Sequence, residues 1–281
     1  MRTILVPVDA SSTSKNAVRF AASWASQYDY DHIILLKSSD GAMFDYLNIA
    51  DGYSLVNEDI INKVQEGTEL MLEQLCRIIK EIAPGIKISK AVSQLTILRS
   101  INELIRDQPS VELIILGSDV KENSDSLVSD NIISIARVSP VKTLIVPNGF
   151  SFRNISKVLV PYDLSQIKKL DRISKFKTIL HDKNLQLLIL NVDTKEKILS
   201  TDARKKDSEE YIAQNLNDIP YSIYHLHNRN IINGILSFAI TNEADLIIAL
   251  PGEHSFLYYL ANRSISEGLY QNISKPVMIL K

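Results

Sequence analysis

One six-residue phrase occurs near the start of this 281-residue chain and again just past its middle. Residues 4–9 read Ile-Leu-Val-Pro-Val-Asp, and residues 158–163 read Val-Leu-Val-Pro-Tyr-Asp. Each copy is a short apolar run, rich in β-branched residues, that ends in an acid and leads into an amphipathic segment containing serine. This order is typical of a buried parallel strand followed by a helix. The repeat therefore predicts two similar domains in tandem.

The length of the chain fits that division, because a domain usually takes roughly 100–200 residues. A turn-rich stretch, Pro147 to Ile155, lies between two apolar runs and is the natural place for a connection. We expect a first domain over residues 1–148, a linker over 149–155 and a second domain over 156–281.

Periodicity within each half predicts strands that alternate with helices. Such alternation requires right-handed crossovers and a parallel sheet. We expect an α/β fold of two tandem doubly wound domains, each a five-stranded, mostly parallel sheet with helices on both faces. The first half predicts strands at 3–8, 33–37, 87–92, 113–116 and 143–146 and helices at 12–27, 58–82, 97–106 and 128–138; the second predicts strands at 157–161, 185–192, 221–225, 246–250 and 277–280 and helices at 166–180, 203–216, 231–241 and 256–271.

Composition argues against several classes of partner. The chain has 31 basic and 33 acidic residues without a block of like charge, which does not favour nucleic acid or a membrane surface. Apolar runs stay below the ~18 residues of a membrane helix, and the start of the chain reads as a strand, so we expect a cytoplasmic protein. Cys76 is the single cysteine and shares a helical face with apolar residues, which predicts a core position. His225 and His227 have no third ligand at a matching spacing, so we expect no metal site.

These features together resemble the universal stress protein family, taken twice on one chain. The resemblance rests on the opening phrase with its serines, on Ala244–Ile248 before a strand, and on Lys275–Leu280 at the end. The nucleotide-binding branch of that family implies ATP in the crevice beyond the carboxyl ends of the strands. There the acid after the first strand lies at the base and ribose, and a Gly-x2-Gly-x9-Gly-Ser/Thr loop wraps the phosphates.

The matching positions keep the acid but not the loop. The acid is present as Asp9 and Asp163, and Gly117 and Ser118 match the start of the first loop, whereas Val120 replaces its second glycine. The end of that loop falls at residues 129–130 or 130–131, where Asp130 would repel a triphosphate. In the second half the three glycine positions and the final hydroxyl are Leu250, Glu253, Arg263 and Ser264. We therefore expect no classical ATP site and no cofactor.

A second polar group, Glu253, His254, Arg263 and Ser264, lies where the second loop would run. It could contact a small carboxylate or phosphate near a helix N-terminus. It could equally consist of a helix cap at Ser255, a surface ion pair and an exposed histidine.

We expect a non-enzymatic stress-response or ligand-sensing protein. The resemblance also implies pairing of the two domains inside the chain through strands 143–146 and 277–280, and it leaves a homodimer open. Two alternatives remain open: an ATP- or AMP-binding switch in the first crevice, and a protein-interaction module. The apolar insertion at 39–57 is the candidate surface for the latter, either as a lid or as a partner site.

Overall fold

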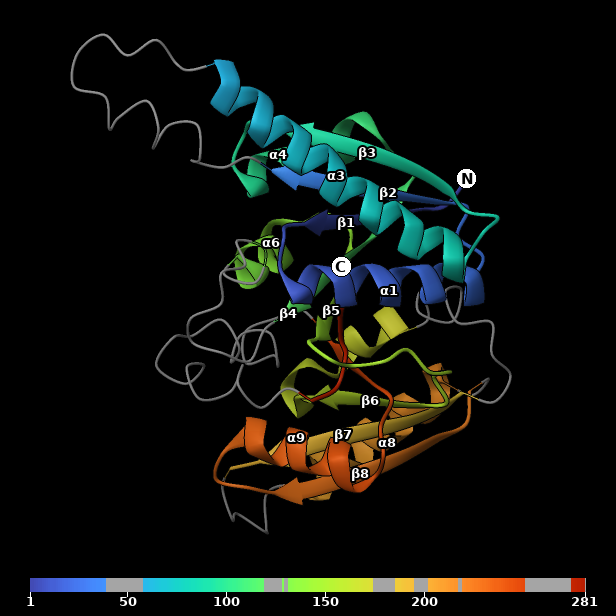
Figure 1. Cartoon of the computed structure of the whole chain (residues 1–281). Helices are drawn as coiled ribbons and strands as arrows, with labels where there is room; N and C mark the ends of the chain where they lie inside the picture. Colours follow the sequence, from blue (N-terminus) through green and yellow to red (C-terminus); the bar gives the residue numbers. More distant parts are fainter. Residues whose placement is uncertain are drawn as a thin grey trace, which may run out of the picture. The chain divides into compact units, whose positions relative to one another are not determined.

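The structure is a computed structural model of the whole chain. It describes residues 1–38, 58–118, 128, 131–173, 185–194, 202–216, 219–250 and 274–280. The described residues divide into two compact units, the first ending at Val141 and the second beginning its main segment at Lys142. Each unit is built around a sheet of largely parallel strands (Figure 1).

The first unit has four strands in the order β3-β2-β1-β4, and all three neighbouring pairs are parallel. Helices connect successive strands, as parallel pairing requires. The strands are β1 (Thr3–Val8), β2 (His32–Ser38), β3 (Lys87–Ser93) and β4 (Val111–Ser118), and the helices are α1 (Ser12–Gln27), α3 (Glu58–Ile82), α4 (Ile97–Asp107) and α6 (Ile132–Val138).

The strand order fixes where a crevice opens. The chain steps from β1 to β2 to β3 in one direction and then returns to β4 on the other side of β1. Right-handed crossovers therefore place α1 and α3 on one face and α4 on the other. In agreement, α1 packs against α3, whereas α4 packs against α6 (Figure 1). The reversal lies between β1 and β4, so ligands of such sheets bind beyond the carboxyl ends of these strands.

Helix α1 covers the sheet with one apolar stripe. Its side chains at positions 17, 20, 21 and 24 and the C-capping Tyr28 are all buried, with Trp24 fully so. Trp24 stacks on Phe20 and contacts Tyr28, with ring centroids 5.9 Å and 4.5 Å apart. Trp24 is therefore a packing residue of the first unit.

Helix α3 buries a narrower face than its sequence indicates. Leu72, Leu75 and Ile79 are buried, whereas Cys76 is only half-buried and Ile82 is exposed. Burial still raises the pKa of the Cys76 thiol. The prediction of a core position for Cys76 was therefore too strong.

The second unit has the strand order β5-β10-β9-β6-β7-β8, in which β9-β6-β7-β8 corresponds to β4-β1-β2-β3 of the first unit. Its neighbours are parallel except β5 and β10, which pair antiparallel with Leu144 opposite Met278. The elements are β5 (Lys142–Pro147), β6 (Lys157–Tyr162), β7 (Gln186–Asp193), β8 (Tyr221–His227), β9 (Leu246–Ala249), β10 (Val277–Ile279), α8 (Asp202–Asn215), α9 (Ile231–Thr241) and the 3₁₀ helix η1 (Leu164–Ile173).

Element η1 corrects the prediction of an α-helix over 166–180. Its apolar residues Leu164, Ile167, Leu170 and Ile173 recur every three positions. That spacing suits a 3₁₀ helix, in which side chains three apart eclipse one another. Leu170 and Ile173 are accordingly buried. Residues 174–184, which held the rest of the predicted helix, lie outside the described part of the chain.

The doubly wound α/β fold is confirmed. Most described elements begin and end within two residues of their predicted bounds, and β1, α1, α3 and α9 match them fully. The predicted helix over 256–271 and the insertion at 39–57 lie outside the described residues. Within the described ranges, every helix is too short or too polar to span a bilayer.

Candidate functional site

The carboxylate of Asp9 lies at the carboxyl end of β1 and is held by the first turn of α1. Its Oδ1 accepts hydrogen bonds from the amide of Ser11 at 3.0 Å, from the Ser11 hydroxyl, and from the Ser14 hydroxyl at 2.7 Å. The Asp9 amide in turn donates to Ser14 Oγ at 2.9 Å. Ser11 also caps α1 by accepting from the Ser14 amide. The serines after the acid therefore build a rigid turn around it.

The second oxygen of Asp9 reaches across the crevice to Val128. The Val128 amide donates to Asp9 Oδ2 at 3.3 Å, and the acid is only 7% exposed. Val128 lies inside the predicted first phosphate loop, just before its last positions at 129–131, and precedes α6. A backbone amide from that region therefore points to a carboxylate of the same chain. Both oxygens of Asp9 have protein donors, which limits what the acid can offer a ligand.

Gly117 on β4 lies against the start of α1. A Cβ at this position would stand 2.5 Å from the carbonyl oxygen of Thr13 and 2.8 Å from its methyl carbon. The glycine is therefore required by the close approach of strand and helix, whether or not a phosphate is bound. Ser118, the last residue of β4, is buried at the same end of the sheet.

Hydroxyl groups join the carboxyl ends of β2 and β3 to α4. The Ser38 hydroxyl donates to the Leu95 carbonyl at 2.6 Å, and the Ser100 hydroxyl lies 2.8 Å from Ser93 Oγ. Beside them, Lys37 Nζ donates to the Ser38 carbonyl at 2.8 Å. These contacts fix polar groups at the carboxyl ends of β2 and β3, which is the same end of the sheet as Asp9.

The acid of the second unit has different surroundings. Asp163 follows β6 and is half-buried at the start of η1. Nearby, Asn191 donates to the Tyr162 carbonyl at 3.1 Å, and the Tyr162 hydroxyl lies 3.5 Å from Ser208 Oγ. Burial raises the pKa of Tyr162. An acid after the first strand thus recurs in both units. Ser165 matches Ser11 in the second sequence, whereas Lys168 stands at the position of Ser14.

Several predicted site residues lie outside the described part of the chain. They include the entire second polar group and most of the first loop. Asn131 is described, at the N-cap position of α6. The undescribed positions are Val120, Ser129, Asp130, Glu253, His254, Ser255, Arg263 and Ser264. The structure thus brings together Asp9, Gly117 and Ser118, and it does not address the grouping of Glu253 with Arg263.

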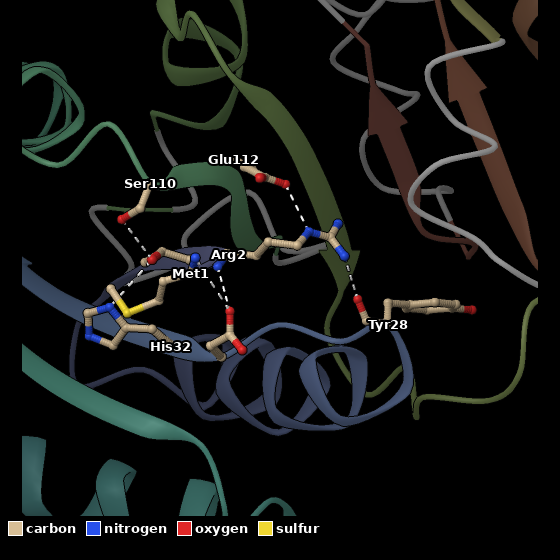
Figure 2. Close-up of polar contacts among 8 residues, drawn as sticks. Met1, Arg2, Tyr28, His32, Ser110 and Glu112 are labelled. Atoms are coloured by element: carbon tan, nitrogen blue, oxygen red, sulfur yellow. Dashed lines mark hydrogen bonds and ion pairs between the residues drawn. The ribbon is translucent and has the colours of Figure 1, made fainter.

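A polar network closes the opposite, amino end of the first sheet. Figure 2 shows Arg2 between Glu112, 3.1 Å from its Nε, and the Tyr28 carbonyl, 2.8 Å from Nη1. The guanidinium also lies 4.2 Å from the ring centroid of Tyr30, whose pKa is raised to about 12 by burial. Arg2 therefore fastens the start of β1 to the end of α1 and to β4.

His32 lies in the same network and is 4% exposed (Figure 2). Its Nε2 is 2.8 Å from Ser89 Oγ and its Nδ1 is 3.4 Å from Thr3 Oγ. Burial, helped by the charge of Lys87, lowers the pKa of this imidazole. These contacts link β1, β2 and β3, so His32 has a structural role in the sheet.

Some polar residues of the site were not predicted, although the sequence contains weak indications of them. Serines 11 and 14 are visible as the serine-rich segment after Asp9, and Lys37 is a cation after four apolar strand residues. Val128 has no such indication, because its backbone amide makes the contact.

In the second unit, His225 Nε2 lies 3.4 Å from a carboxylate of Glu209 on α8. Among the described residues, no group of three or more potential metal ligands gathers.

Comparison with known proteins agrees with these features. The sequence profile of the universal stress protein family matches residues 1–147. A universal stress protein from Archaeoglobus fulgidus DSM 4304 is similar in structure, with a TM-score of 0.68 and 19% identity over 99% of this chain and 98% of that chain. A putative universal stress protein from Pseudomonas aeruginosa UCBPP-PA14 has a TM-score of 0.57 and 13% identity over 100% and 93%. At these identities the likeness shows the fold alone. No curated protein matches the sequence.

Proposed function

The chain belongs to the universal stress protein family, and we propose that it is a non-enzymatic stress-response protein that senses a small ligand in the crevice of its first unit. In this proposal the crevice is degenerate as a nucleotide site and is not a classical ATP site. The tandem arrangement and the domain bounds 1–148 and 156–281 are part of the same proposal.

The internal use of Asp9 carries this proposal. Its two carboxylate oxygens accept from Ser11, Ser14 and Val128. A carboxylate committed in this way is poorly placed to accept a proton or to contact a ribose. This supports a structural role for the acid and argues against its use as a general base.

The remaining glycine supports the same conclusion. Gly117 is explained by its approach to Thr13, so its presence alone is not evidence for a phosphate loop. The second glycine position is Val120, and the third glycine and the hydroxyl fall at Ser129 and Asp130 or at Asp130 and Asn131. These residues offer neither glycine flexibility nor an intact anion nest. Asp130 would also repel a triphosphate.

The antiparallel pair of β5 and β10 supports the tandem part of the proposal. It covers an edge on each strand that would otherwise be open to another chain. We propose that this pair joins the two predicted domains within one chain, with homodimers formed, if at all, through other surfaces.

The test is thermal unfolding of the purified full chain with Mg-ATP, AMP and a panel of small acidic metabolites. A ligand that binds only the native state raises the midpoint by mass action. We expect no rise with Mg-ATP and a rise with a smaller anion. A rise with Mg-ATP that the Asp9→Asn variant abolishes would establish the nucleotide switch instead. No response to any compound would favour a protein-interaction module.

A further inference from the structure

Lys37 is a half-buried cation at the carboxyl end of β2. It pairs in register with Val8, the residue before Asp9, so the two side chains belong to adjacent strand ends. Its Nζ donates to the Ser38 carbonyl at 2.8 Å, which draws the ammonium toward the end of the strand. The charge therefore lies on the crevice side of the first unit and away from the Arg2 network.

The ammonium has few partners for its degree of burial. An ammonium has three donors, and among the described residues the Ser38 carbonyl is the hydrogen-bond acceptor that Lys37 has. No described carboxylate lies within ion-pair distance of its Nζ. Burying a cation without a paired anion costs free energy. Within the described part of the chain, the position is thus unfavourable for an unpaired cation and suited to a bound acceptor.

Asp9 does not remove this cost. Its charge opposes the lowering of the Lys37 pKa that burial causes, so the two groups interact through space. However, the oxygens of Asp9 are already held by Ser11, Ser14 and Val128. Two of the Lys37 donors are consequently available to an oxygen acceptor from outside the described residues.

We propose that Lys37 binds the oxyanion of a small ligand, a single carboxylate or phosphate group, at the carboxyl end of β2. This inference rests on the proposed function, because it names the ligand class of the same crevice. A lysine is a compact point charge that suits such a group without demanding bidentate geometry. One cation beside the negative Asp9 suits a ligand of low charge better than a triphosphate.

The experiment is isothermal titration calorimetry of the full chain with inorganic phosphate, AMP and acetate, using wild type, Lys37→Met and Lys87→Met. Methionine keeps an unbranched side chain and removes the charge. Lys87 is the matched control, because it is an exposed lysine at the other end of the neighbouring strand β3. Comparing the affinities for phosphate and AMP with the affinity for acetate distinguishes a phosphate ligand from a carboxylate ligand.

We expect Lys37→Met to weaken binding at least about tenfold and Lys87→Met to leave it unchanged. Without ligand, Lys37→Met should unfold at the same or a higher temperature than wild type, because it removes a buried charge. Equal affinity in Lys37→Met, or a clearly lower unfolding temperature, would overturn the inference while leaving wild-type binding intact. Absence of binding to wild type with all three probes would overturn both the inference and the ligand-sensing function.

Discussion

Replacing Gly117 with alanine separates a packing role for this glycine from a role in phosphate binding. Gly117 lies in β4 without a left-handed backbone, so alanine can adopt its conformation and the clash alone decides the outcome. The new Cβ would lie 2.5 Å from the carbonyl oxygen of Thr13, where ordinary contact begins at 3.4 Å. Strand and helix would have to separate by close to 1 Å.

The cost should fall at the upper end of the range for overpacked cores. The added methyl would contact the backbone of the first turn of α1, which cannot move aside as a flexible side chain would. We expect Gly117→Ala to lower the free energy of unfolding by about 3 kcal/mol in the absence of any ligand. The loss should appear in the first unit, because α1 and β4 both belong to it.

Urea unfolding followed by tryptophan fluorescence measures this change directly. Trp24 is the chain's single tryptophan and lies fully buried in α1, the helix that the clash would displace. Gly67→Ala is the control, because its Cβ would meet nothing within 4 Å in the middle of α3. That control should gain about 0.5–1 kcal/mol from helix propensity. A Gly117→Ala protein as stable as wild type would refute the packing explanation.

Three further variants test the polar contacts. Asp9→Ala should cost about 3 kcal/mol in urea unfolding, since buried donors lose a charged acceptor; an unchanged midpoint would contradict the structural role. The lowered pKa of His32 means that the unfolded chain takes up a proton that the folded chain resists. Stability should therefore fall as pH drops through about 6.5, and His32→Gln should flatten that slope. Asp245→Ala should lower the free energy of unfolding by about 2–3 kcal/mol, because the carboxylate accepts hydrogen bonds from Ser156 and pairs with Arg153. Calorimetric unfolding of this variant and wild type measures the difference.

Much of the fold could be predicted because its signals are local. The repeated phrase marks the first strand of each unit, and the alternation of apolar strands with amphipathic helices requires parallel pairing. The exception is η1, where Leu164, Ile167, Leu170 and Ile173 also fit a loosely amphipathic α-helix. A period of three and one of 3.6 differ little over ten residues, so packing decides between them.

The site was less predictable because its decisive contacts are not local. The sequence identifies Asp9 and Gly117 through the strand ends on which they lie. It does not show that the Val128 amide turns toward Asp9, since a backbone donor leaves no trace in residue type. Nor does it show that Gly117 faces the Thr13 carbonyl, because that depends on the distance between α1 and β4.

These two contacts change the interpretation of Asp9 and Gly117, the residues that match the family positions. An acid and a glycine kept at family positions would ordinarily favour a retained ligand. Here Asp9 stabilises the start of α1, and Gly117 permits the close packing of that helix on β4, so both are needed even without nucleotide. Lys37 differs from them, because the described fold gives its charge no carboxylate partner. Lys37 is therefore the residue on which the proposed ligand site depends most.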